Sequence, residues 1–177
     1  MLMRTVYLSF WFVVIVWFPS TASAEDNLYF SGTLVNEPCV LAMEDELLEL
    51  DFKNVIEKEL YLNGRTRGRP ITLHLQNCQL GTGKSKVKLS FNGPESTETP
   101  GLLMIQSADV HGLLVGLETP GGKPLVLNKI HDMGALIKGD NLISFNAYLQ
   151  GETKAMQNKS IGLGVFYSIM SFTVSYE

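Results

Sequence analysis

The sequence predicts an all-β fold, an antiparallel β-sandwich, on two observations. Apolar and polar residues alternate with a period of two over much of residues 71–177. Turn signals rich in glycine, proline and asparagine separate these alternating stretches, at 92–94, 99–101, 119–124 and 138–141. Many short strands separated by such turns are typical of two antiparallel sheets packed face to face.

Four stretches gather their apolar side chains on one face of a strand, as the alternation of a strand requires. In ITLHLQNC the apolar face holds Ile71, Leu73 and Leu75. The last stretch places Met170, Phe172, Val174 and Tyr176 together in the same way. The four predicted strands are 71–78, 86–91, 142–149 and 168–177.

Three less regular regions are also assigned to the sheets. Short apolar runs at 102–106 and 113–117 predict two further strands. The segment 44–61 is rich in Glu and Leu, a composition that also suits a helix. We interpret its LLELDF stretch, residues 47–52, as a strand followed by a short irregular link.

Residues 1–24 have the features of a secretory signal peptide. Arg4 supplies the positive start, 6–18 form an apolar core, and Ala22-Ser23-Ala24 fits a cleavage site. The alternative is a membrane anchor, but the 13 apolar residues of 6–18 are too few to cross about 30 Å of hydrocarbon at about 1.5 Å per residue. No other stretch is apolar enough to span a membrane, so we expect no span after cleavage. The remaining 153 residues, 177 minus 24, suit one domain.

The charge of the mature chain argues against some partners. The whole chain carries 14 Lys and Arg against 18 Asp and Glu. Loss of Arg4 with the signal leaves 13 against 18, a net charge of −5. Nucleic acids and anionic membrane surfaces attract basic proteins, so neither is expected as a partner.

Two cysteines, Cys39 and Cys78, are present in the chain. Since an exported protein meets an oxidising environment, we expect them to form a disulfide. The alternative is a pair of free buried thiols. Two cysteines alone are too few for a structural zinc site.

The sequence contains no motif for catalysis or for a bound cofactor. The GTGKS stretch at 81–85 fails as a phosphate-binding loop because Cys78 stands where that motif needs glycine. The histidines, His74, His111 and His131, lack the spacing of metal ligands. We therefore expect no enzyme activity, no cofactor and no metal site.

The two ends of the mature chain are unusual when taken together. The chain starts with an apolar strand in which Leu28, Phe30 and Leu34 share one face and Gly32 interrupts it. Its last strand ends at Glu177, although an immunoglobulin-type sandwich needs one more strand to cover its core. Each end alone has a simple explanation: the first strand can pair with its own sheet, and the last strand can be an edge strand. Together they suggest that the front strand of one copy fills the gap in the next, a contact that propagates a fibre.

These residues resemble the pilin subunits of chaperone–usher fimbriae. The resemblance covers the whole mature chain and rests on the signal peptide, the alternating front strand and the two cysteine contexts. The matching residues are Leu28, Phe30, Gly32 and Leu34 before Pro38-Cys39, Leu75, Asn77 and Cys78 in L-x-N-C, and Tyr176 as the penultimate residue. The segments 100–117 and 138–149 are most similar to the minor tip or adaptor subunits of P-type pili.

The resemblance implies an incomplete immunoglobulin-like sandwich that lacks its seventh and final strand. It also implies three kinds of partner: a periplasmic chaperone that lends a strand to the open groove, an outer-membrane usher, and neighbouring pilin subunits. The subunit would be exported through the periplasm to the cell-surface fimbrium and contribute to adhesion. The domains would be a signal peptide (1–24), a donor-strand extension (25–36) and a pilin domain (37–177).

Carried over by position, the resemblance assigns two sets of site residues. The inserting face of the donor strand would be Leu28, Phe30, Gly32 and Leu34. The strand that flanks the groove and binds the chaperone would present Phe172, Val174 and Tyr176. Glycine at position 32 would fit where the acceptor core comes closest to the donor backbone.

Two alternatives remain open at this point. One is a pilus-terminating subunit, which still inserts its own front strand. The other is a secreted ligand-binding β-sandwich, such as a sugar-recognising adhesin. Adhesins of the pilin family that this sequence resembles carry a binding domain ahead of the pilin domain. The extension here has only 12 residues, 25–36, so we expect no such domain.

Overall fold

The computed structural model describes residues 30–32, 34, 37–81 and 85–177. Contacts between residues divide the chain into two units, 1–35 and 36–177. In the first unit the described residues form no helix or strand, and the side chains of Phe30 and Leu34 are 83% and 101% exposed. Leu28 lies outside the described residues.

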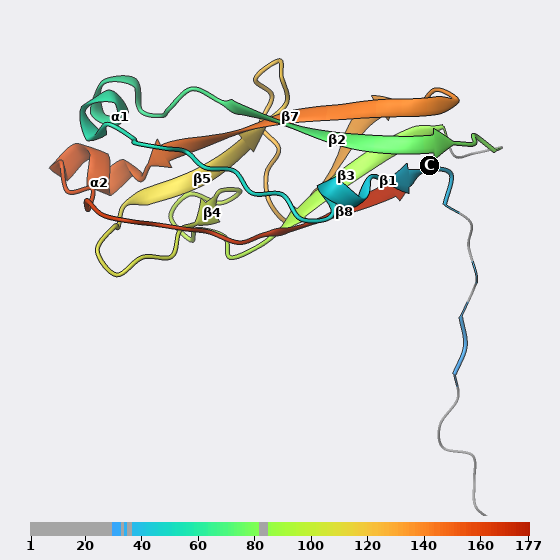
Figure 1. Ribbon diagram of the computed structural model, residues 1–177. Helices are drawn as coiled ribbons and strands as arrows, with labels where there is room; N and C mark the ends of the chain where they lie inside the picture. Colours follow the sequence, from blue (N-terminus) through green and yellow to red (C-terminus); the bar gives the residue numbers. More distant parts are fainter. Residues whose placement is uncertain (1–29, 33, 35–36, 82–84) are drawn as a thin grey trace, which may run out of the picture. The chain divides into compact units, whose positions relative to one another are not determined.

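The second unit is built from two antiparallel sheets (Figure 1). The first sheet has the strand order β1-β2-β7-β5-β4 and the second the order β6-β3-β8. The strands of the first sheet are β1 (Val40–Leu41), β2 (Arg69–Cys78), β7 (Gly139–Gly151), β5 (Leu113–Glu118) and β4 (Leu103–Met104). Those of the second are β6 (Ile130–Ala135), β3 (Lys86–Asn92) and β8 (Ser171–Tyr176).

Three short helical segments lie between the strands. They are a 3₁₀ turn (Met43–Asp45), α1 (Glu57–Asn63) and α2 (Thr153–Asn158). Figure 1 shows α1 and α2 at the same end of this unit. Among the residues that the structure describes, no helix is long and apolar enough to cross a membrane.

The core lies between the two sheets, where the alternating apolar faces meet. Leu73 and Leu75 of β2 are fully buried, and Phe91 of β3 contacts Phe145 of β7 with ring centroids 5.0 Å apart. The alternation that predicted the strands is therefore confirmed as a division between core and solvent. On β3 the buried positions are Val87, Leu89 and Phe91, and on β7 they are Ile143, Phe145, Ala147 and Leu149, together with Tyr148 and Gly151.

The prediction of a strand at 47–52 is wrong. The chain there forms neither a strand nor a helix. Leu50 and Phe52 pack on the core, as the alternation requires. However, no backbone–backbone hydrogen bond found among the described residues involves 47–55. A run of alternating side chains becomes a strand only when a neighbouring strand offers partners for its backbone.

Five elements were not predicted from the sequence: β1, the 3₁₀ turn, α1, α2 and β6. Helix α1 ends at Gly64, which adopts φ 77° as a left-handed cap, so that glycine was an available signal. Helix α2 has six residues and ends at Lys159 with φ 50°. Strand β6 does not alternate, since His131 and Asp132 are adjacent and Gly134 follows, and the register of its pairing with β3 shifts between Val87 and Lys88.

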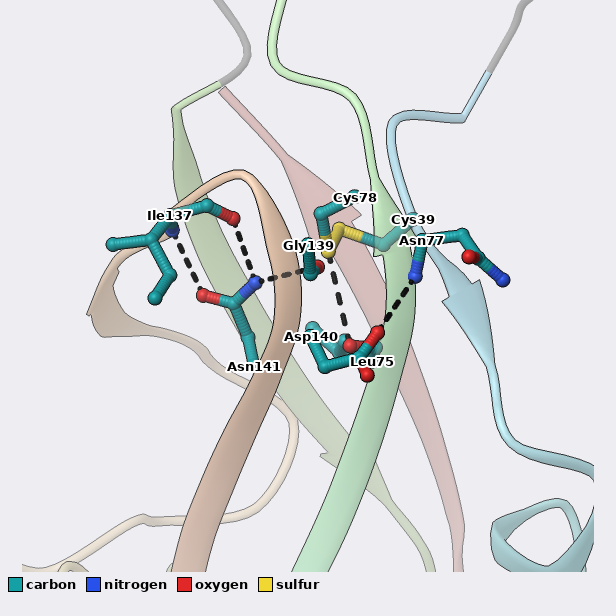
Figure 2. The surroundings of a disulfide bond; sticks show 8 residues. All are labelled: Cys39, Leu75, Asn77, Cys78, Ile137, Gly139, Asp140 and Asn141. Atoms are coloured by element: carbon teal, nitrogen blue, oxygen red, sulfur yellow. Dashed lines mark hydrogen bonds between the residues drawn. A yellow bond between two sulfur atoms is a disulfide. The ribbon is translucent and has the colours of Figure 1, made fainter.

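The predicted disulfide between Cys39 and Cys78 is confirmed (Figure 2). It joins the residue before β1 to the last residue of β2. Beside it, the backbone N–H of Asn77 donates to Asp140 Oδ1 at 3.1 Å. The side chain of Asn141 accepts from the N–H of Ile137 and donates to its carbonyl, both at 2.8 Å. These contacts fix the end of the sheet at which the disulfide lies.

Replacing Cys39 and Cys78 with serine is expected to lower the free energy of unfolding by about 4 kcal/mol, because the closed loop restricts the unfolded chain. The cysteines are 39 residues apart. Urea unfolding of the double variant and the oxidised parent measures the difference. The parent in reducing agent should unfold like the variant, and a difference below about 1 kcal/mol would show that the disulfide is not a major constraint.

Candidate functional site

The inner face of β8 is only half covered, in contrast to its neighbour β3. Val87, Leu89 and Phe91 of β3 are 0% exposed. Their register partners on β8 are Tyr176, Val174 and Phe172, which therefore point to the same side of the sheet. These three pack on the core but remain partly exposed. One row of core side chains thus lacks part of its cover.

The outer edge of β8 has no partner strand in the part of the chain that the structure describes. β8 lies at the end of the strand order β6-β3-β8 and is hydrogen-bonded to β3 alone. The pairing continues one residue past β8, since Glu177 exchanges backbone hydrogen bonds of 2.6 and 3.0 Å with Lys86. A strand edge of this kind offers a row of N–H and C=O groups to another strand.

The segment 47–55 faces the same opening from the other side. Its Leu50, Phe52 and Val55 pack on the core and are partly exposed. Beyond one end of this segment, the Tyr61 hydroxyl of α1 accepts the backbone N–H of Ile161 at 3.0 Å.

We call the two segments 47–55 and 163–176, with their partly exposed side chains that pack on the core, the seam. Figure 1 shows the two segments running along the same side of the unit, one after β1 and the other leading into β8. No backbone hydrogen bond found among the described residues joins them. Each side has core-facing apolar side chains and backbone groups without strand partners, which are the two things that an added strand would bind.

The start of 47–55 is held by a buried carboxylate. Asp45 is 3% exposed, and its Oδ2 accepts the backbone N–H of His74 and lies 3.0 Å from the Nδ1 of the same residue. The N–H of Ala42 also donates to the carbonyl of His74 at 2.9 Å. These bonds attach the chain to β2 just before 47–55, so the seam is fixed at this end.

Burial raises the pKa of the Tyr176 hydroxyl above its usual value of 10.0, and the charge of Glu37 adds to the effect. The phenol is desolvated although its row is half covered. Because the folded state prefers the neutral phenol, this group stabilises the fold while it is protonated. The contribution is complete below pH 10.0 and is lost as the pH rises through the folded pKa.

The described site residues belong to the two different units. Phe172, Val174 and Tyr176 lie along the seam on β8. Of the predicted donor residues, Phe30, Gly32 and Leu34 belong to the first unit, where a Cβ added to Gly32 would meet nothing within 4 Å. Among the residues that the structure describes, no contact requires glycine at position 32.

Sequence reasoning missed the side chains that line the other side of the seam. They are Leu50, Phe52 and Val55. The alternation in LLELDF was the available signal, and it was interpreted as a strand of the sheet rather than as one side of an opening.

The histidines have separate neighbours. His74 contacts Asp45, while His111 and His131 lie within hydrogen-bonding distance of the carbonyls of Asp109 and Val126. Within residues 30–32, 34, 37–81 and 85–177 no group of three potential metal ligands is found. Residues 82–84 of the GTGKS stretch lie outside the described part of the chain.

The family model described as fimbrial protein matches residues 28–177. This chain is a member of the fimbrial protein family. A fimbrial-like protein of Escherichia coli (strain K12), YfcP, which is described as uncharacterized, is 30% identical over 157 residues. The alignment covers 87% of this chain and 85% of that protein. The prediction of an exported subunit of a cell-surface fimbrium is confirmed.

Two solved structures of fimbrial proteins have the same fold. The crystal structure of the P pilus rod subunit PapA matches with a TM-score of 0.67 and 22% identity, covering 80% of this chain and 100% of PapA. The structure of a chaperone–usher pilus matches with a TM-score of 0.70 and 22% identity, covering 90% of this chain and 99% of that one. The predicted fold class, an incomplete immunoglobulin-like sandwich of the pilin type, is confirmed, as is the chaperone–usher pilin family.

Raising the pH above 10.0 is expected to destabilise the folded subunit in part through Tyr176. The unfolded chain ionises this phenol first, so the free energy of unfolding falls as the pH rises. Tyr176→Phe removes this contribution, and urea unfolding at pH 8 and pH 11 should show a smaller loss for the variant than for the parent. An equal loss in both proteins would contradict the burial of this hydroxyl.

Proposed function

We propose that this chain is a minor subunit, at the tip or in an adaptor position, of a chaperone–usher pilus, and that it polymerises by donor-strand exchange. The residues of the extension 25–36 insert into the seam of a neighbouring subunit. The observation that carries the proposal is the half-covered row on β8 opposite a fully buried row on β3. The role is structural rather than enzymatic.

The inserted strand would add apolar contact as well as backbone pairing. Phe30 and Leu34 are fully available, since their side chains are 83% and 101% exposed in this chain. With Leu28 they form the inserting face. Burying three large apolar side chains contributes about 5–9 kcal/mol before the loss of chain entropy, at about 1.5–3 kcal/mol each. Backbone hydrogen bonds to the edge of β8 add to this and set the register.

The glycine at position 32 is best explained by its contact with the neighbouring subunit that accepts the strand. No steric contact with the described part of the chain requires a glycine there. In the inserted strand, a residue without a Cβ fits where the acceptor core approaches the donor backbone most closely. A large side chain at position 32 would then be tolerated in the free extension and rejected in the seam.

An open seam also explains why helper proteins are needed before assembly. Exposed core side chains beside an unpaired strand edge promote aggregation. A periplasmic chaperone that lends a strand to the seam and binds along Phe172, Val174 and Tyr176 would protect it. An outer-membrane usher would then allow the extension of the next subunit to replace that strand. Because the two contacting surfaces differ, the contact does not close and a fibre grows.

The tip or adaptor position rests on the similarity of segments 100–117 and 138–149 to such subunits of P-type pili. The likeness to a rod subunit at 22% identity concerns the fold alone. A pilus-terminating subunit is the alternative within the same family. A secreted, self-contained binding module is less well supported, because its sandwich would be expected to cover its own core.

Gly32→Leu is expected to block incorporation into the fibre while leaving the subunit folded, because the added side chain clashes only in a partner's seam. Gly81→Leu is a matched control, since a Cβ at Gly81 also meets nothing within 4 Å and its φ is not positive. Cells that express the complete pilus system allow subunit yield in the periplasm and in the fibre to be compared. Normal incorporation of Gly32→Leu would refute the donor role, and loss of folding would assign Gly32 to the subunit's own structure.

The proposed position predicts a low copy number. Immunogold labelling of purified fibres should detect this chain at or near the distal end, and quantitative mass spectrometry should find far fewer copies than of the main subunit. Uniform labelling along the shaft would overturn the minor role while leaving strand exchange intact. Labelling only at the cell-proximal base would favour the terminating subunit.

A further inference from the structure

A recess separate from the seam's β8 side lies between α1 and the start of β2. It has a volume of about 700 Å³ and is formed within one continuous stretch of the chain, from Phe52 to Arg69. Its lining residues are Phe52, Asn54, Val55, Glu59, Asn63, Arg65, Thr66, Arg67, Gly68 and Arg69. The volume falls in the range of about 300–1,000 Å³ that is usual for small-ligand sites.

Two arginines of the recess are held in place by the protein. The guanidinium of Arg65 donates to both carboxylate oxygens of the buried Glu118, at 2.8 and 3.3 Å, and lies 4.3 Å from the ring centre of Tyr148. Arg69 donates to the carbonyl of Asp51 at 2.8 Å. Each keeps further N–H donors, since a guanidinium has five.

Arg67 lies between them in the sequence and is exposed. Among the residues that the structure describes, it takes part in no side-chain hydrogen bond or ion pair, whereas its two neighbours are bound. A guanidinium in this state can bind a carboxylate or sulfate group bidentately.

The recess is basic in an acidic protein. Glu118 balances Arg65, and Glu59 is the one acidic residue of the lining, so Arg67 and Arg69 leave one net positive charge. The whole chain has a net charge of −4. This acidity disfavours a long nucleic-acid backbone and leaves a local anion as the better match.

The other lining groups suit a sugar. The amides of Asn54 and Asn63 supply donors and acceptors for hydroxyl groups, and Phe52 supplies an aromatic surface. We propose that this recess binds an acidic polysaccharide, with Arg67 contacting a sulfate or carboxylate group of one sugar residue. This inference does not depend on strand exchange or on the position of the subunit in a fibre.

The test compares Arg67→Gln with Lys129→Gln in the mature chain, purified from periplasm with any protein that accompanies it. Lys129 is exposed beside β6 of the other sheet, and its replacement makes the same change in charge. Binding is measured to immobilised dextran sulfate, carboxymethyl dextran and uncharged dextran. The two charged polymers distinguish a sulfate from a carboxylate ligand.

The parent should bind at least one charged polymer and not uncharged dextran. Arg67→Gln should weaken that binding about tenfold, the size of one lost charge-assisted contact, and Lys129→Gln should leave it within about twofold of the parent. Equal weakening by the two variants would mean general charge attraction and would overturn the site. Absence of binding to both charged polymers would overturn it as well. Normal fibre incorporation of Arg67→Gln would separate this site from the assembly function.

Discussion

The half-covered row of Phe172, Val174 and Tyr176 is the constraint on which the rest of this structure depends. Their partners on β3 are fully buried, so the sandwich is complete on one side of β8 and open on the other. The opening is bounded by 47–55, whose side chains reach the core although its backbone has no strand partner. Burial of apolar surface dominates folding, and an incompletely buried core therefore favours any strand that covers it.

The features around this opening keep it in shape. The disulfide joins the chain before β1 to the end of β2, and buried Asp45 attaches the following turn to His74. Together they hold 47–55 beside the core without sheet hydrogen bonds. An opening fixed in this way needs little reorganisation to accept a strand, which lowers the entropic cost of binding. The proposed polysaccharide recess lies at the end of the same segment and shares Phe52, Asn54 and Val55 with it.

The sequence predicted those parts of the fold that follow from local alternation. Strands β2, β3, β7 and β8 and the disulfide are where the pattern put them. Alternation could not show that 47–52 lacks a partner, because pairing depends on residues distant in the chain. β6 was missed because its polar residues and Gly134 do not alternate. The core-facing residues of β8 were predicted from the sequence. The seam residues Leu50, Phe52 and Val55 could be recognised only once the fold was known. The same holds for the arginines of the recess.

Amide hydrogen exchange with an added peptide of residues 25–36 tests the central claim most directly. Applied to the subunit released from any helper, the peptide should slow exchange in both 172–176 and 47–55, the two sides of the seam. The same peptide with leucine at position 32 should protect neither. The account is contradicted if both segments are already protected without peptide, or if the native peptide leaves their exchange unchanged.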